Sequence, residues 1–216
     1  MGTAEPGAPV HVGDPAPDFT LPAVQSERSI SLGDYRGKSP VFLAIDRGLY
    51  CPFCRRHIAQ LGATSEKLRA VGVETLAVIA TKPDRARMYL RFRPTRVPLV
   101  ADPDRVTHRQ YGLAKPPITP EFIQAAEATL VNPTGELPAP VPVLAVIDAL
   151  NQFDSFQPNE TDRQDQESQT PQLVGQFLID TDGLVRWANI ECSVEGLAGV
   201  GKFPTDDELI AAARRL

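Results

Sequence analysis

The sequence predicts an α/β protein whose central mixed sheet is flanked by helices. Residues 41–45 and 73–80 are apolar, β-branched runs typical of buried strands, and a segment with helical apolar spacing lies between them. Strand, helix and strand in succession favour a right-handed crossover and parallel pairing. Residues 173–179 and 184–188 are joined by a turn with an Asp-Gly pair, which is a strong signal for an antiparallel hairpin. Parallel and antiparallel pairs together make the predicted sheet mixed.

The other core elements continue this alternation. We expect a helix over residues 82–92, a short strand over 97–101 and a short helix over 104–111. A capping box at residues 205–208, Thr-x-x-Glu, opens the last helix. Residues 13–22 are rich in proline, which removes backbone donors, so this segment is expected to run extended along a sheet edge.

The length of the chain indicates its domain organisation. A chain of 216 residues is long enough for one buried core with an elaboration, so we expect a single domain. Residues 1–12 are rich in Pro, Gly and Ala and are predicted to be a disordered arm, which leaves residues 13–216 as the domain. Within it, residues 114–171 are longer than an ordinary connection and are interpreted as an insertion before the C-terminal hairpin.

The insertion contains two apolar helical candidates, residues 121–130 and 143–153, on either side of a proline-rich stretch. Each has an apolar face that the core, the other helix or a second subunit must cover. The insertion is therefore either a lid over the site or an association surface, and we expect a homodimer. Residues 154–169 are almost wholly polar and are predicted to be mobile.

The charge and the cysteine content of the chain indicate which binding partners and which cellular compartment to expect. The net charge of −5 comes from interspersed acidic and basic residues, and no apolar run approaches the length of about 18 residues that spans a membrane. Neither a nucleic acid nor a membrane is therefore an expected partner. The first residues carry no features of a secretory signal, and three cysteines fit a reducing compartment, so we predict a cytoplasmic location.

The chemistry is predicted to lie in the Cys-Pro-Phe-Cys motif at residues 51–54. The preceding strand ends in a short turn, and Pro52 suits the first position of a helix because it has no N–H to leave unpaired. Cys51 and Cys54 are therefore predicted at the helix N-terminus, where unpaired N–H groups and the helix dipole favour a thiolate. Two cysteines at this spacing can close a disulfide, so the pair is predicted to be a reversible dithiol switch. Three arginines add positive charge nearby: Arg47, Arg55 and Arg56.

Other interpretations of the cysteines are open. His57 and Cys192 could complete a zinc site, but structural zinc sites usually pair two Cys-x-x-Cys motifs and the sequence has one. The cysteines could also be unreactive core residues, or passengers in a non-enzymatic binding module. The cap position, the proline and the arginines favour redox chemistry, so we predict an enzyme with no metal and no cofactor. His57 is expected to be partly exposed, and Cys192 is more typical of a small buried apolar residue.

A family resemblance supports the redox interpretation. The strand, turn, Cys-Pro-Phe-Cys motif and helix resemble the thioredoxin-fold oxidoreductases, and the Pro-Phe pair is similar to the glutaredoxin variant of the motif. Residues 13–22, GDPAPDFTLP, resemble the opening of the alkyl hydroperoxide reductase and thiol-specific antioxidant family. Together the motifs indicate a peroxiredoxin-like protein. The resemblance implies an antioxidant thiol oxidoreductase with a thioredoxin-like fold, whose core covers residues 13–113 and 172–216.

The resemblance implies two redox mechanisms, which assign the cysteines differently. By analogy with thioredoxin, Cys51 is the exposed thiolate that attacks a disulfide, and Cys54 resolves the mixed disulfide. Laid over the peroxiredoxin signature Pro-x-x-x-Thr-x-x-Cys, the chain has Cys54 as the peroxide-attacking residue and Cys51 as the resolving one. The substrate is accordingly a protein or small-molecule disulfide, or hydrogen peroxide or an organic hydroperoxide. A thioredoxin or glutathione system is the expected thiol reductant.

The match to the peroxiredoxin signature is incomplete. Arg47 stands at the position of its proline, Cys51 replaces its threonine, and Val174 falls where an arginine precedes Gly-x-Phe. A peroxidase pocket must stabilise charge as the O–O bond breaks, and Arg47 is the candidate to supply the lost cation. We therefore rank disulfide exchange through Cys51 ahead of peroxide reduction through Cys54. Pro171 is the nearest candidate for the cis-proline that thioredoxins place beside the site.

Overall fold

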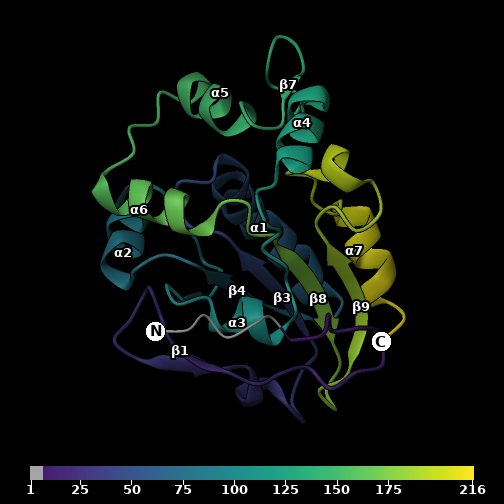
Figure 1. Cartoon of the computed structure of the whole chain (residues 1–216). Helices are drawn as coiled ribbons and strands as arrows, with labels where there is room; N and C mark the ends of the chain where they lie inside the picture. Colours follow the sequence, from purple (N-terminus) through teal and green to yellow (C-terminus); the bar gives the residue numbers. More distant parts are fainter. Residues whose placement is uncertain (1–6) are drawn as a thin grey trace.

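A computed structural model of the chain describes residues 7–216, and a five-stranded mixed sheet forms its centre (Figure 1). Its strands are β3 (Val41–Asp46), β4 (Glu74–Ile79), β5 (Leu99–Ala101), β8 (Gly175–Ile179) and β9 (Val185–Ile190). The strand order is β5-β4-β3-β8-β9, with β3 parallel to β4 and antiparallel to β8. The predicted crossover and the predicted hairpin therefore meet on β3, and the mixed α/β fold is confirmed.

Helices cover both faces of this sheet together with the N-terminal segment. The core helices are α1 (Pro52–Ala70), α2 (Pro83–Phe92), α3 (Val106–Gln110) and α7 (Asp206–Ala213), and short 3-10 turns lie at Leu32–Tyr35 and Gly196–Gly199. No helix among residues 7–216 is long and apolar enough to cross a membrane.

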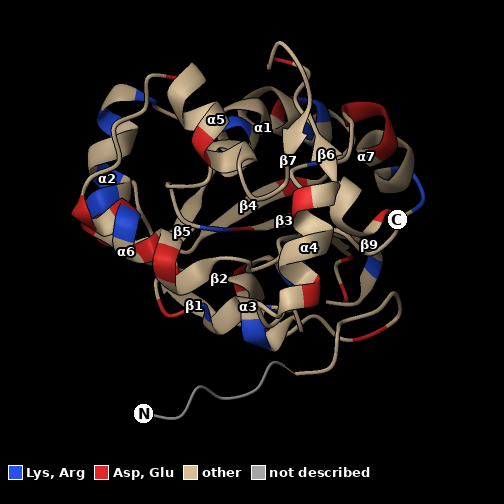
Figure 2. Ribbon diagram, turned by 45° about the horizontal axis from the view of Figure 1, so that its top comes forward, with Lys and Arg blue, Asp and Glu red and all other residues tan. Residues whose placement is uncertain are grey.

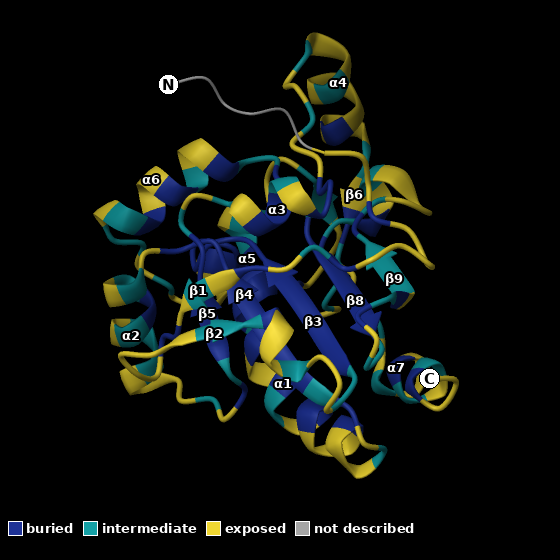
Figure 3. Cartoon of the chain, turned by 90° about the horizontal axis from the view of Figure 1, so that it is seen from below, coloured by how far each residue is buried: buried dark blue, intermediate teal, exposed yellow. Residues whose placement is uncertain are grey.

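The central strand is buried along its whole length because both of its faces are covered (Figure 3). Side chains of a strand alternate between the two faces. Phe42 and Ala44 accordingly pack with apolar residues of α1, α2 and α7, whereas Leu43 and Ile45 pack with the N-terminal segment and the residues that follow α3. This packing fixes β3 and hence the start of the loop that leads to the cysteines.

The N-terminal segment is held against the core from residue 7 onward. Gly7 N donates to Arg109 O at 3.0 Å, Val10 N donates to Tyr111 O at 3.3 Å, and Val10 is buried. The structure thus differs from the predicted disordered arm over residues 7–12, and residues 1–6 lie outside the described residues. Gly13 N donates to Val185 O in β9, and Ala16 N donates to Gly183 O just before it. The proline-rich segment therefore runs along this sheet edge, as predicted, before the small hairpin of β1 (Thr20–Pro22) and β2 (Ser29–Ser31).

The insertion is folded through much of its length. It holds α4 (Pro120–Ala128), β6 (Leu130–Val131), β7 (Val141–Pro142), α5 (Val146–Phe153) and α6 (Glu160–Gln169). Figure 1 shows α4, β7 and α5 at the top of the molecule, beyond the strands of the sheet. The predicted helices 121–130 and 143–153 are α4 and α5, and both are shorter than predicted because the chain between them forms the β6–β7 hairpin.

Two arginines of α1 tie α5 to the core. Arg55 Nη2 donates to Asn151 Oδ1 at 2.9 Å and to Asp154 Oδ2 at 3.0 Å, and its guanidinium lies 3.8 Å from the ring centroid of Phe156. Arg56 Nη2 donates to Asp154 Oδ1 at 2.6 Å. These contacts place α5 over the N-terminal end of α1, where the two cysteines lie.

The polar segment that the sequence predicts to be mobile contains the helix α6, which is anchored through buried polar side chains. Asp162 forms a bidentate pair with Arg85 of α2 at 2.9 and 2.8 Å, and Asp165 accepts from Thr81 Oγ1 at 2.9 Å. Figure 2 shows acidic residues of α6 beside basic residues of α2. Gln169 Oε1 accepts from Gly48 N at 2.8 Å, in the loop before the cysteines. The prediction was wrong for residues 160–169 because their polar groups have partners in the protein as well as in water.

We expect Asp162→Ala to lower the free energy of unfolding by about 3 kcal/mol, because it leaves the Arg85 guanidinium buried without its partner. Glu167→Ala, at an exposed position of the same helix, should change it by less than about 0.5 kcal/mol. Urea unfolding of both variants measures the difference. Equal effects would contradict the anchoring of α6 through Asp162.

Candidate active site

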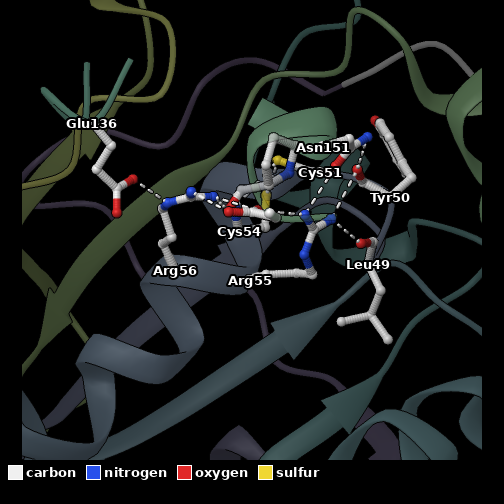
Figure 4. Close-up of polar contacts among 10 residues, drawn as sticks. Leu49, Tyr50, Cys51, Cys54, Arg55, Arg56, Glu136 and Asn151 are labelled. Carbon is white, nitrogen blue, oxygen red and sulfur yellow. Dashed lines mark hydrogen bonds and ion pairs between the residues drawn. The ribbon is translucent and has the colours of Figure 1, made fainter. Parts of the chain in front are cut away.

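The two cysteines of the motif lie at the start of α1, as the sequence predicts (Figure 4). Cys51 is the N-cap residue with an extended backbone, Pro52 occupies the first helical position, and the Cys51 sulfur accepts from Cys54 N at 3.3 Å. A sulfur thus takes the place that a serine or aspartate oxygen usually has at a helix start. The cap stabilises negative charge on Cys51.

The two sulfurs are in contact and fully buried. Cys54 Sγ donates to Cys51 Sγ across 2.7 Å, and both cysteines are free thiols with 0% exposure. The expectation that Cys51 is exposed was therefore wrong. Apolar residues of the core, Tyr50, Phe53 and Val174, cluster with the cysteines. Four apolar residues of the insertion join the same cluster: Val131, Leu137, Val146 and Leu150.

The environment separates the acidities of the two thiols. Burial on its own would raise the pKa of Cys51, but the hydrogen bond from Cys54 and the positive charge of Arg47 outweigh it and lower that pKa to about 7. The pKa of Cys54 is raised well above its usual range by burial, by the hydrogen bond that Cys54 donates to Cys51, and by the negative charge on Cys51. The environment therefore favours the thiolate form at Cys51 over Cys54.

Arg47 is the cation beside this pair, and its own contacts hold it in place. Arg47 Nη1 donates to Gln172 O at 2.9 Å, and Arg47 Nη2 donates to Glu191 Oε1 at 2.9 Å. Glu191 Oε1 also accepts from Gly201 N at 2.8 Å. A guanidinium buried with a carboxylate and a carbonyl keeps its charge, so Arg47 can act on the sulfur as a fixed positive group.

The other two arginines of the motif have a different role from the one predicted. Arg55 Nη1 donates to the carbonyl oxygens of Leu49 and Tyr50 at 2.9 and 3.2 Å, and Arg56 pairs with Glu136 and Asp154 (Figure 4). Both side chains thus connect the cysteine loop and α1 to the insertion. They shape the site through the backbone and through its cover.

His57 is buried, which differs from the predicted partial exposure. Its Nδ1 lies 3.0 Å from Asp46 Oδ2, and its ring stacks on Phe203 at a centroid distance of 4.0 Å. Asp46 ends β3, so this pair links the central strand to α1 just behind the cysteines. Among residues 7–216, no group of three or more His, Cys, Asp or Glu side chains is placed to hold a metal ion.

Comparison with known proteins decides the family. A sequence profile described as the AhpC/TSA family matches residues 12–188. The chain belongs to this family. Peroxiredoxin-2 of Cricetulus griseus is 32% identical over 116 residues, which are 49% of this chain and 57% of that protein. Peroxiredoxin Bcp of Escherichia coli K12 is 25% identical over 105 residues, which are 49% of this chain and 66% of that protein. The chain thus spans less than two thirds of the length of these curated relatives.

Solved structures share the fold of this AhpC/TSA member. The peroxidoxin BcpB from Mycobacterium tuberculosis superposes with a TM-score of 0.58 at 14% identity, over 96% of this chain and 98% of that one. A reduced 2-Cys peroxiredoxin from Plasmodium vivax gives 0.60 at 15% identity, over 95% and 81%. A putative thiol:disulfide interchange protein DsbE from Chlorobium tepidum gives 0.51 at 20% identity, over 94% and 99%. All three are similar in fold.

The departures of this AhpC/TSA chain from the expected signature fall at one end of the sheet. Val174, where the resemblance implies an arginine, is buried in the apolar cluster around the cysteines. The register pairs Ile45 with Gly175, so the residues just after β3 and just before β8 lie at the same end. Arg47 therefore brings a guanidinium to the region that Val174 leaves apolar.

The remaining predicted residues lie near this pair. The Thr170–Pro171 peptide bond is cis, so Pro171 is the cis-proline that the sequence suggested. Cys192 is half-buried, and burial raises the pKa of its thiol to about 12, so it is protonated at neutral pH. Sequence reasoning missed Glu191 and Gln172, which hold Arg47 from more than a hundred residues away and carry no motif of their own.

Thiolate absorbance in the ultraviolet should rise with pH through a step near pH 7, because the Cys51 thiol loses its proton there. Cys54→Ala removes the hydrogen bond to that sulfur and should move the step to clearly higher pH. Cys54→Ser keeps an O–H donor and is the matched control, with a smaller displacement. A step that stays in place in Cys54→Ala would contradict the role of the hydrogen bond.

Proposed function

We propose that the protein is a thiol peroxidase in which Cys51 attacks the peroxide and Cys54 resolves the product. The observation that carries the proposal is the geometry of the buried pair, in which Cys51 Sγ caps α1 by accepting from Cys54 N at 3.3 Å and also contacts the Cys54 thiol. A thiolate is the reactive form toward peroxides. Membership of the AhpC/TSA family supports the same chemistry.

The reaction proceeds in two steps. The Cys51 thiolate attacks the terminal oxygen of a hydroperoxide, the O–O bond breaks, and the leaving alkoxide or hydroxide takes a proton from solvent to become alcohol or water. Cys51 is then a sulfenic acid. The Cys54 thiol attacks this sulfur, which forms the Cys51–Cys54 disulfide and releases one water. Two electrons from an external thiol reductant, of the thioredoxin or glutathione type, restore the two thiols.

The roles of the cysteines in this proposal reverse those of the family signature. The signature places the attacking sulfur at Cys54, but burial and the hydrogen bond that it donates keep Cys54 protonated. Cys51 has the helix cap, the donated hydrogen bond and the Arg47 charge. Arg47 also stabilises the negative charge that develops on the leaving oxygen.

Burial of both sulfurs is why we place peroxide reduction ahead of disulfide exchange, which the sequence ranked first. A peroxide is small, whereas a protein disulfide must bring its own backbone to the attacking sulfur. Cys51 and Cys54 have 0% exposure under the insertion. Exchange through Cys51 is the second candidate, and it requires displacement of the insertion.

The cytoplasmic location and the homodimer stay predictions, the latter supported by exposed apolar residues of the insertion such as Ile123.

Stopped-flow oxidation of the reduced protein tests the proposal. Hydrogen peroxide or an organic hydroperoxide should oxidise the wild-type protein far faster than a free thiol, and Cys51→Ser should abolish this phase. Cys54→Ser should keep the fast first step but accumulate a sulfenic acid at Cys51, detected by mass spectrometry.

Cys192→Ser is the control, and it should behave as the wild type because its thiol is protonated at neutral pH. Fast oxidation that depends on Cys54 and survives loss of Cys51 would reverse the assigned roles. Peroxide reactivity no better than that of a free thiol, together with rapid reduction of a model disulfide through Cys51, would make disulfide exchange the function.

A further inference from the structure

The loop between β3 and Cys51 is held by side chains that come from outside it. Gly48 N donates to Gln169 Oε1 at 2.8 Å, and Leu49 N donates to Thr81 Oγ1 at 3.0 Å. Leu49, Thr81 and Gln169 are all buried, and buried N–H groups need partners within the protein. Two successive N–H groups of the loop therefore depend on two side chains.

Both of these side chains are fixed by further hydrogen bonds. Gln169 Nε2 donates to Ala80 O at 2.5 Å, and Thr81 Oγ1 donates to Asp165 Oδ2 at 2.9 Å. A threonine hydroxyl can donate and accept together, so Thr81 bonds to Leu49 and Asp165 at the same time. Asp165 and Gln169 lie one turn apart on α6, and both face the same loop. The insertion thus reaches the loop through two neighbouring side chains of this helix.

The backbone of the loop packs closely on these groups at Gly48. A Cβ atom at this position would lie 2.9 Å from Thr81 Oγ1 and 3.1 Å from both Ala80 O and Asp165 Oδ2. Contacts between carbon and oxygen are normally about 3.3 Å or longer. The glycine therefore allows the loop to lie directly against Thr81 and α6.

The loop connects the two groups whose separation matters for the reaction. Arg47 comes directly before Gly48, and Cys51 N donates to Gly48 O at 3.0 Å. The Arg47 charge lowers the pKa of Cys51. Because the Coulomb energy between two charges falls with their distance, a displaced loop would weaken this effect. The end of α6 also leads to Gln172, whose carbonyl oxygen accepts from Arg47 Nη1 at 2.9 Å.

We propose that Thr81 and Gln169 are positioning residues of the thiol peroxidase, which hold the backbone of residues 48 and 49 so that the Arg47 guanidinium stays close to the Cys51 sulfur. The inference rests on the proposed peroxidase function. Asp165 orients the Thr81 hydroxyl. All three residues act through the loop, on the charge and the sulfur at its two ends. The polar helix of the insertion thereby has a part in the reaction that is separate from the apolar cover over the cysteines.

Thiolate absorbance of the reduced full chain tests the inference without any peroxide. Thr81→Val keeps the shape of the side chain but removes the hydroxyl, and should move the Cys51 step to higher pH by about one unit. Thr81→Ser retains the hydroxyl and should keep the step within about 0.3 units of the wild type. Rescue by serine separates the hydrogen bond from the volume of the side chain. A purely structural role would lower the stability of Thr81→Val but leave the step of the folded protein in place.

Gln169→Leu makes the matching change on α6 and should also move the step to higher pH, because it leaves Gly48 N without its partner. Gln164→Leu is the control, since it makes the same substitution at an exposed position of the same helix. At pH 7 hydrogen peroxide should oxidise Gln169→Leu and Thr81→Val about fivefold more slowly than the wild type, because a one-unit shift leaves about a tenth of Cys51 ionised. The rate constant of Gln164→Leu should stay within about twofold of the wild type.

Circular dichroism establishes that each variant is folded before its step is measured. If Thr81→Val and Gln169→Leu do not fold, hydrogen exchange of the reduced wild-type protein is the test instead. The amides of Gly48 and Leu49 should then exchange far more slowly than those of an unstructured chain, and unprotected exchange at both would overturn the inference.

The outcomes separate this inference from the proposed function. A step that stays in place in folded Thr81→Val and Gln169→Leu, while peroxide still oxidises the wild type rapidly, would overturn the inference and keep the proposed function. Oxidation of the wild type at the rate of a free thiol would overturn the proposed function instead. A displaced step in Thr81→Val that serine restores would even then support the positioning of Arg47 against Cys51.

Discussion

The hydrogen bond from the Cys54 thiol to the Cys51 sulfur is the interaction on which the site depends. It exists because a helix begins between the two cysteines, with Cys51 as its cap and Pro52 as its first residue. In water such a bond would compete with solvent, but the apolar cover of the insertion excludes that competition. The same burial would suppress a thiolate if the donated bond and the Arg47 charge did not outweigh it. The start of the helix, the apolar cover and the Arg47 cation therefore act together on the ionisation of Cys51.

The position of Arg47 is determined by the sheet. β3 lies between a parallel and an antiparallel neighbour, and its end is paired with the beginning of β8. A residue just after β3 is consequently close to the segment just before β8, where the resemblance implies an arginine and this chain has Val174. The Arg47 guanidinium comes from the other of these two strand ends, and its positive charge favours the thiolate form of both cysteines.

Local signals in the sequence were sufficient for the fold and for the cysteine pair. The apolar runs, the Asp-Gly turn and the Cys-Pro-Phe-Cys motif each act within a few residues, and they predicted the mixed sheet and the helix start. What depended on distant residues was missed. The burial of Cys51, the partners of Arg47 and the order of α6 arise from side chains that meet only after folding, such as Glu191 with Arg47 and Asp162 with Arg85. The sequence of a polar segment does not indicate whether its side chains will form hydrogen bonds with water or with other parts of the protein.

Because the two sulfurs are completely buried, the low pKa of Cys51 does not come with exposure to reagents in solution. A cysteine with a pKa of about 7 is ordinarily one that electrophilic reagents find first, yet Cys51 has 0% exposure. Surveys that rank cysteines by their labelling with bulky electrophiles would therefore place Cys51 among inert core residues. In this fold the apolar cluster that includes the insertion therefore hides from such reagents a sulfur whose pKa is lowered.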